Sequence, residues 1–166
     1  MSKKTYTAVN ETGCCPVPNV EDWDESSVTW QNKKFIKDST FNLFHMPLNM
    51  GRVMKRMWAK VQQAEAAPPT DEFMLLSYDP SPWKGDHFMT VTKEVPNAEN
   101  VTLSGTFLTK VFEGPYKEAP KWVEEMQKYV TSQGEELQQL YFFYTTCPKC
   151  AKHYGKNYVV ALAKVK

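Results

Sequence analysis

One order of elements occurs twice in this chain, and no other feature of the sequence constrains the fold as strongly. In the second copy, residues 106–112 are rich in β-branched and aromatic side chains, as expected for a strand, and a Gly-Pro dipeptide ends it. Residues 115–130 then carry apolar side chains at every third or fourth position, which predicts an amphipathic helix that begins at Pro115. Residues 140–146 and 158–165 follow as a predicted pair of strands.

The first half of the chain repeats this order. Residues 40–46 are strand-like, and residues 50–67 carry an apolar stripe at helical spacing until two consecutive prolines end the helix. Residues 73–78 and 87–92 are the predicted strand pair, and they flank a proline-rich turn. The two copies are about 65 residues apart, which is longer than the repeat of a solenoid protein. The sequence therefore predicts a pseudo-twofold domain.

The predicted fold is a single α+β domain over residues 36–166. It has an antiparallel sheet and two long helices on one face of that sheet. Its two repeats, at about residues 40–95 and 105–165, are strand–helix–strand–strand units. A chain of 166 residues is long enough for one such domain with a sizeable core.

Residues 1–35 differ from the rest of the chain because they show little periodicity. They contain Trp23 and Trp30, whereas disordered segments are poor in aromatic residues. We therefore predict an extended arm that packs on the domain through these two side chains and leads into a strand at residues 34–37.

The second strand-to-helix turn resembles that of a known family. The Gly-Pro-Tyr motif at residues 114–116, together with the doubled order of elements, is similar to the GyrI-like small-molecule-binding domain, and the resemblance covers roughly residues 36–165. Residues 112–116 and 146–152 look like a cysteine-containing branch of this family whose members are often labelled hydrolases. The family also forms the drug-sensing half of some multidrug-responsive transcription activators. The resemblance implies a stand-alone multidrug-binding protein, of the kind linked to drug resistance, with its ligand in a cleft between the two repeats.

Aromatic residues make up 13% of the chain and are concentrated on or beside the predicted strands. About half of them should pack in the core, because successive residues of a strand point to opposite faces. An uncovered aromatic face binds flat organic molecules by stacking and attracts delocalised cations. We therefore expect the protein to bind flat, lipophilic, often cationic molecules. The predicted ligand-binding residues are Phe44, Tyr78, Trp83, Phe112, Glu113, Tyr116, Phe142 and Tyr144.

A carboxylate is expected to compensate the charge of a cationic ligand. Glu113 is the main candidate because it directly precedes the strand-to-helix turn, although a solvated glutamate near a helix N-terminus explains it equally well. The resemblance implies a buried glutamate on the strand at residues 140–146, but that strand carries no carboxylate. Glu113 and Asp79 are then the residues left for this role.

The alternative function is hydrolysis, which the resemblance implies because some relatives open the strained electrophilic rings of toxic natural products. Glu113 or Tyr116 would then position the attacking water in the same cleft. Spacing alone identifies no Ser–His–Asp or Cys–His arrangement, because catalytic partners meet in space and not in sequence. Whether the protein is an enzyme stays open, and the aromatic excess favours binding, which needs no catalytic group.

Four residues could form a metal site. Cys147 and Cys150 form a C-x-x-C pair, His153 follows three residues later, and Cys15 lies in the N-terminal arm. Four such ligands can hold zinc in a tetrahedral site. Their spacing does not match the patterns of structural zinc sites, so we expect reduced thiols, no metal and no cofactor. The remaining histidines, His45 and His87, are expected to be structural.

Bulk properties exclude several classes of partner. The net charge of +1 gives no reason to expect nucleic-acid binding. The chain has neither an apolar run near 18 residues nor a signal-peptide pattern, so we expect no membrane partner and a cytoplasmic location. It also lacks a glycine-rich phosphate-binding loop, which argues against a nucleotide enzyme. The expected partners are therefore small aromatic or cationic molecules.

Overall fold

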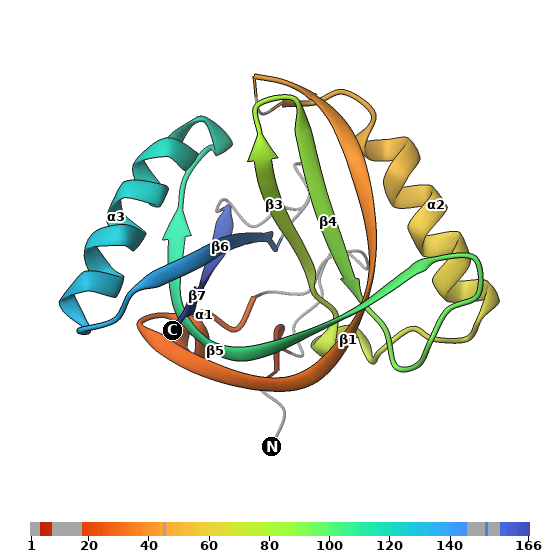
Figure 1. Cartoon of the computed structure of the whole chain (residues 1–166), viewed down its shortest axis with the longest axis horizontal. Coiled ribbons are helices and arrows are strands. Elements are labelled where there is room, and N and C mark those ends of the chain that lie inside the picture. Colours follow the sequence, from red (N-terminus) through yellow and green to blue (C-terminus); the bar gives the residue numbers. More distant parts are fainter. Residues whose placement is uncertain (1–3, 8–17, 45, 146–151, 153–156) are drawn as a thin grey trace. The chain divides into compact units, whose positions relative to one another are not determined.

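The computed structural model describes residues 4–7, 18–44, 46–145, 152 and 157–166, and its elements are shown in Figure 1. The chain divides into two compact units. We call Met1–Trp30, Thr70–Glu72 and Gly105–Lys166 the terminal unit, because it contains both ends of the chain. Gln31–Pro69 and Phe73–Ser104 form the central unit.

The terminal unit contains three antiparallel strands and one long helix. Strand β7 (Tyr158–Val165) pairs with β5 (Glu99–Glu113) on one side and with β6 (Leu137–Tyr144) on the other. Helix α3 (Ala119–Ser132) follows a 3-10 turn, η2 (Tyr116–Glu118). The expected strand pair of this half is confirmed, although β6 begins three residues before the predicted segment.

Helix α3 begins later than the sequence analysis expected. The proline in its first turn is Pro120, whereas Pro115 lies before η2. Strand β5 ends where Gly114 adopts a φ of 138°, a conformation that favours glycine. The chain then needs the 3-10 turn before it enters the helix. The expectation that Pro115 opens the helix is therefore wrong by four positions.

The apolar stripe of α3 packs on one face of the terminal strands. Trp122, Met126 and Val130 are buried at successive i, i+4 and i+8 positions, and they meet a layer of small and branched residues from β7. Small side chains in this layer allow the helix to approach closely. The β7 residues in this core are Val159, Ala161, Ala163 and Val165.

The opposite face of the terminal strands is covered by the N-terminal segment. The ring of Tyr6 packs edge-on against Phe143, and Trp30 lies 4.8 Å from Phe107. Helix α1 (Val20–Trp23) adds further contacts, because the Thr109 hydroxyl donates a 2.6 Å hydrogen bond to the Trp23 carbonyl. Both faces of this sheet are therefore buried by residues of its own unit.

Strand β1 (Ser26–Leu43) is longer than the sequence analysis expected. It joins the segments expected at residues 34–37 and 40–46, and it begins within the segment expected to be an arm. Its first half alternates between half-buried and exposed residues without an apolar stripe. Such a strand gives no signal in an analysis that depends on apolar periodicity.

The central unit has a similar arrangement. Strand β4 (Lys84–Thr90) pairs antiparallel with β1 and with β3 (Leu75–Ser81), and the short β2 (Met46–Pro47) pairs with the end of β1. Helix α2 (Met50–Gln63) buries Val53, Met57 and Val61 against the sheet, again at i, i+4 and i+8. It ends four residues before the predicted terminus, and Glu65 follows with a φ of 53°.

The two faces of the central sheet carry different side chains. Ile36 and Met89 belong to the core under α2, and Asp38 on the same face is bonded to Arg56 of α2. Because side chains alternate along a strand, the residues between them point away from α2. We call this second surface the distal face. Its members include Lys37, Ser39, Tyr78, Lys84, Asp86 and Phe88.

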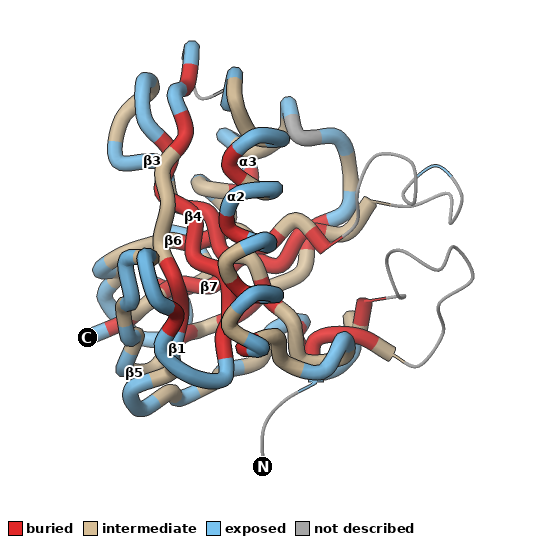
Figure 2. Tube along the Cα trace, turned by 90° about the vertical axis from the view of Figure 1, so that its right-hand side faces the viewer, coloured by how far each residue is buried: buried red, intermediate tan, exposed pale blue. Residues whose placement is uncertain are grey.

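Burial is greatest in the middle strand of each unit. Figure 2 shows β4 and β7 as the most continuous runs of buried residues, and their burial patterns agree. The described residues thus form an α+β protein with antiparallel strand pairs. None of the helices in the described ranges is both long and apolar enough to cross a membrane. The superposition of the repeats and the placement of both long helices on one sheet face stay predictions.

Candidate functional site

In the terminal unit, the predicted ligand-binding rings form a row on the side of α3. Phe112 stacks on Trp122 at 5.8 Å, and Trp122 lies 6.4 Å from Phe142. Phe142 in turn stacks on Tyr144 at 6.2 Å. All four rings belong to, or pack against, the core under the helix. These rings therefore pack in the core, and their role in ligand binding stays a prediction.

The other predicted residues of the terminal unit lie at the end of β5. Glu113 is the last residue of this strand and is exposed. Tyr116 begins η2, and its side chain lies outside the described residues. The structure therefore does not bring Glu113 into a buried site within the described part of this unit.

In the central unit, two predicted aromatic residues meet at the tip of the sheet. The rings of Phe44 and Trp83 lie 5.2 Å apart, and they are 74% and 53% exposed. Trp83 is fixed through its backbone, because the Asn42 N–H donates a 2.9 Å hydrogen bond to its carbonyl. The neighbouring large apolar side chains that are also exposed are Phe41, Leu43 and Leu48. This tip offers aromatic surface to solvent, unlike the rings of the terminal unit.

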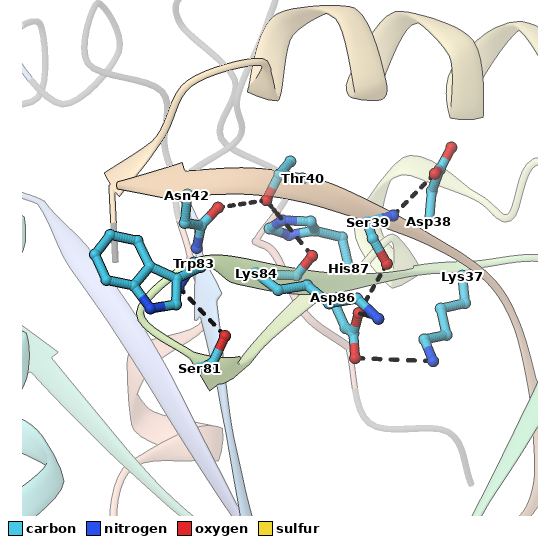
Figure 3. A network of polar contacts seen from close by, with 11 residues as sticks. Lys37, Asp38, Ser39, Thr40, Asn42, Ser81, Trp83, Lys84, Asp86 and His87 are labelled. Atoms are coloured by element: carbon cyan, nitrogen blue, oxygen red, sulfur yellow. Dashed lines mark hydrogen bonds and ion pairs between the residues drawn. The ribbon is translucent and has the colours of Figure 1, made fainter. Parts of the chain in front are cut away.

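A buried carboxylate on the distal face was not identified from the sequence. Asp86 of β4 is 7% exposed, and the Ser39 hydroxyl donates a 2.8 Å hydrogen bond to its Oδ1 (Figure 3). The Lys37 ammonium lies 3.7 Å from Oδ2, and the Lys84 ammonium lies 3.7 Å from Oδ1. A buried carboxylate is costly unless it is paired and hydrogen-bonded. Asp86 meets this requirement with one short hydrogen bond and two loose ion pairs.

Two aromatic residues are neighbours of this carboxylate on the distal face. Phe88 follows Asp86 by two positions on β4, so the two side chains share a face, and Tyr78 lies opposite Asp86 on β3. The Lys37 ammonium lies 6.0 Å from the centroid of the Phe88 ring, within the range of a cation–π interaction. A cation at this place therefore meets both a carboxylate and a ring face.

On the opposite face, His87 is held between two hydroxyl groups. Its Nδ1 lies 2.9 Å from the Ser77 hydroxyl, and its Nε2 lies 3.0 Å from the Thr40 hydroxyl. Thr40 donates its own proton to the Asn42 side-chain oxygen at 2.8 Å, so its oxygen accepts from Nε2–H. The Ser77 hydroxyl therefore donates to Nδ1, which fixes the tautomer of the ring.

Burial lowers the pKa of His87 from 6.5 to about 4, although the nearby charges of Asp86 and Asp38 act in the opposite direction. The ring is therefore neutral at pH 7. Burial raises the pKa of the Asp38 carboxyl, but the hydrogen bonds from Arg56 and the Ser39 N–H, together with nearby positive charge, outweigh it and lower that pKa below its ordinary value. Both nitrogen contacts of Arg56 with this carboxylate are 2.8 Å.

The network around His87 leaves no space for a side chain at position 85. A Cβ on Gly85 would lie 2.8 Å from the Thr40 hydroxyl, 3.0 Å from the Asn42 amide and 3.2 Å from an Asp79 carboxylate oxygen. Glycine is therefore required here by close packing of polar groups. Asp79, the second carboxylate that the sequence analysis considered, borders this network at the exposed end of the sheet.

The candidate metal ligands Cys15, Cys147, Cys150 and His153 all lie outside the described residues, as does His45. Within the ranges that the structure describes, no group of three or more His, Cys, Asp or Glu side chains is placed to hold a metal ion. The expectation about metal therefore stays a prediction.

The alternation of residues along β4 already indicates the position of Asp86. The strand predicted at residues 87–92 left Asp86 outside it. In the structure, β4 begins at Lys84. Extending the alternation back to that residue would have placed Lys84, Asp86 and Phe88 on one face and His87 on the other.

Comparison with known sequences identifies one family. The model of the family described as "Bacterial hydrolase" matches residues 5–165, which is nearly the whole chain. Among curated proteins, no sequence matches.

Several solved structures have a similar fold. The EcmrR C-terminal domain is 11% identical with a TM-score of 0.68, and the match covers 87% of this chain and 98% of that domain. A hydrolase from Listeria innocua is 11% identical with a TM-score of 0.64, covering 87% and 94%. SAV2435 bound to tetraphenylphosphonium is 13% identical with a TM-score of 0.51, covering 85% and 93%. Because the identities are this low, these similarities show only that the folds are alike. In fold, they agree with the GyrI-like resemblance.

Proposed function

The chain belongs to the family described as "Bacterial hydrolase". We propose that this member binds lipophilic cations at the distal face of the central unit. The observation that carries this proposal is the buried carboxylate of Asp86, which lies beside the Phe88 ring and faces the ammonium groups of Lys37 and Lys84. The binding of tetraphenylphosphonium by SAV2435, which has a similar fold, supports the same class of ligand.

The chemistry of the site favours delocalised cations over small hydrated ones. A cation that enters a buried place must lose its hydration, and this cost is lower when its charge is spread over a large apolar skeleton. The Phe88 ring face then contributes about 0.5–2 kcal/mol through cation–π attraction. A carboxylate that is already desolvated adds a charged interaction without a new desolvation cost of its own.

The sequence analysis proposed a wider set of contacts in a cleft between the two repeats. That cleft stays a prediction, as do the contributions of Phe112, Tyr116, Phe142 and Tyr144. The exposed pair of Phe44 and Trp83 supports stacking of flat ligands at the tip of the central sheet. For the carboxylate, we now prefer Asp86 to Glu113, because Asp86 is buried and Glu113 is exposed.

A titration with tetraphenylphosphonium tests the proposal. Wild-type protein should bind it with a micromolar dissociation constant, about −8 kcal/mol, and should show quenched tryptophan emission. Asp86→Asn should weaken this binding by about 1–3 kcal/mol, the usual effect of losing a charged partner. Glu113→Gln is the matched control, and its affinity should equal that of the wild type.

Triphenylphosphine oxide serves as a neutral ligand of related shape. Its affinity should be nearly the same for wild type and Asp86→Asn, because it carries no net charge for the carboxylate to compensate. The proposal is wrong if no lipophilic cation binds saturably below a dissociation constant of about 1 mM. It is also wrong if Glu113→Gln weakens binding and Asp86→Asn does not.

The second candidate function is hydrolysis, in line with the family description. The sequence analysis assigned the attacking water to Glu113 or Tyr116. The structure adds a different arrangement, because the Ser77 hydroxyl donates its proton to a neutral imidazole, as an activated nucleophile does. Ser77 is 9% exposed and His87 is 4% exposed, so both residues are buried.

Mass spectrometry of reaction products distinguishes these arrangements. With an electrophilic substrate such as an epoxide or an activated ester, loss of a general base should lower the turnover by about 10²–10⁴-fold. A fall of this size in Glu113→Gln would support water activation, and a fall in Ser77→Ala would support a serine nucleophile. If the wild type converts no member of the panel, the binding function is preferred.

A further inference from the structure

We infer that Lys37 is a built-in competitor for the cation site, and that a cationic ligand binds by displacing its ammonium group from Asp86 and Phe88. This inference rests on the proposed binding function and concerns the regulation of that site. The geometry in Figure 3 carries it, because Lys37 points along the distal face toward the Asp86 carboxylate.

The position of the Lys37 ammonium is that of a bound cation. It lies 3.7 Å from Asp86 Oδ2 and 6.0 Å from the centroid of the Phe88 ring. Lys37 lies directly opposite Phe88 in the pairing of β1 with β4, so the two side chains are neighbours on the distal face. The protein therefore fills with its own side chain the place where a carboxylate and a ring face meet.

The contact is loose enough to be exchanged. At 3.7 Å, the distance exceeds that of a charged hydrogen bond, which is about 2.7–2.9 Å. The contrast with Arg56 is clear, since its two nitrogens lie 2.8 Å from the carboxylate oxygens of Asp38. The Lys37 side chain is also 27% exposed, so its ammonium can move into solvent without a large rearrangement.

Asp86 keeps its other partners while Lys37 leaves. The Ser39 hydroxyl stays bonded to Oδ1, and the Lys84 ammonium faces the same oxygen. The carboxylate is therefore never left without compensation during the exchange, which would otherwise be costly for a buried charge. The ligand takes over Oδ2 and the ring face that Lys37 vacates.

This arrangement selects ligands by their charge and by how far that charge is delocalised. A neutral molecule that displaced Lys37 would leave Asp86 with weaker compensation, so the lysine opposes its binding. A lipophilic cation replaces both the charge and the cation–π contact. The site should therefore discriminate in favour of delocalised cations that fit against Phe88.

Lys84 provides a matched control for the charge. It lies at the same distance from the other oxygen of Asp86, but its side chain is 55% exposed. Lys37→Met and Lys84→Met remove the same charge near the same carboxylate. If Lys37→Met raises the affinity more than Lys84→Met does, the difference reports the removal of a competitor and not merely the loss of one positive charge near Asp86.

The experiment compares the affinity of tetraphenylphosphonium for wild type, Lys37→Met and Lys84→Met. Lys37→Met should bind three- to tenfold more tightly than wild type. Lys84→Met should tighten binding by a clearly smaller factor, because it removes a charge near Asp86 but frees no place beside the Phe88 ring. Adding Asp86→Asn to Lys37→Met should abolish the gain. Far-UV circular dichroism of each variant confirms that it is folded.

A second readout follows the lysine itself. Acetylation by an amine-reactive ester, quantified by mass spectrometry at each lysine, should become at least twofold faster at Lys37 when tetraphenylphosphonium saturates the protein. The rate at Lys84 should stay unchanged. Equal affinities of the three proteins, or protection of Lys37 by the ligand, would overturn the displacement while leaving the binding function intact. Absence of binding in both wild type and Lys37→Met would overturn both proposals.

Discussion

The terminal and central units each place a long helix against antiparallel strands, but they differ on the sheet face away from the helix. In the terminal unit, this face carries Phe107, Tyr141 and Phe143, and the N-terminal segment covers it with Tyr6 and Trp30. In the central unit, the distal face combines charged groups, those of Lys37, Lys84 and Asp86, with buried apolar side chains that include Phe35, Leu76 and Phe88. The first arrangement gains stability from burial. The distal face retains the buried carboxylate of Asp86, although burying a charge costs free energy. Charged groups retained in this way are typical of functional sites.

The helix-facing sides differ in a related way. Both helices bury three apolar residues at i, i+4 and i+8. Below α3 the core is apolar and aromatic, whereas the sheet surface on the α2 side continues into the hydrogen-bonded network of His87, Ser77 and Thr40. Each of these polar groups needs a partner because it is buried. We therefore expect aromatic residues of the terminal unit to contribute most to the free energy of unfolding. We expect polar residues of the central unit to determine how this free energy changes with pH.

The largest expected effect concerns Trp122, which is 4% exposed and lies between Phe112 and Phe142. Trp122→Ala should lower the free energy of unfolding by about 3–5 kcal/mol, because a large buried ring leaves a cavity. Trp83→Ala, at an exposed tip of the central unit, should change it by less than about 1 kcal/mol. Urea unfolding of both variants measures the difference, and similar losses would break the comparison between the units.

The second effect is a pH dependence that arises from His87. Its pKa in the folded state is about 4, below the ordinary value of 6.5, so the unfolded state binds more protons between these values. The stability due to the neutral ring is fully present above pH 6.5 and is lost as the pH falls toward 4. The lowering corresponds to about 3 kcal/mol.

Urea unfolding between pH 7 and 4 checks this effect. The wild type should lose stability over this range, and His87→Gln should show a much flatter profile because glutamine does not titrate. Parallel profiles of the two proteins would mean that the central polar network does not control the acid sensitivity.

The smallest effect tests the cover of the terminal sheet. The Thr109 hydroxyl is fully buried and donates to the Trp23 carbonyl. Thr109→Val should cost about 1–3 kcal/mol, because that carbonyl would lose a partner. Limited proteolysis should then cleave the N-terminal segment faster than in the wild type. An unchanged cleavage rate would show that the hydrogen bond does not hold this segment.

The sequence predicts elements well where apolar side chains follow a clear period. Residues 158–165 match β7, and the stripes of α2 and α3 are in the expected places, because burial on one face imposes that period. The first half of β1 was missed because its residues alternate between half-buried and exposed and carry no apolar stripe. Helix ends were displaced because the 3-10 turn before α3 depends on local backbone geometry.

The site was harder to predict than the fold. The sequence analysis selected aromatic residues by type, and the structure places four of them beside α3 or on the distal face and two at an exposed tip. It selected Glu113 because of its position before a turn, whereas the buried carboxylate is Asp86. Burial of a charged residue depends on which strands flank it, and composition does not reveal this.

The most direct test of the account is an NMR titration of ¹⁵N-labelled protein with tetraphenylphosphonium, in which the shift of each backbone amide is followed. The account predicts that the largest saturable shifts occur in the central unit, at and around Lys37, Asp86 and Phe88. Shifts confined to the terminal unit near Phe112 and Tyr144, with none on β4, would contradict it.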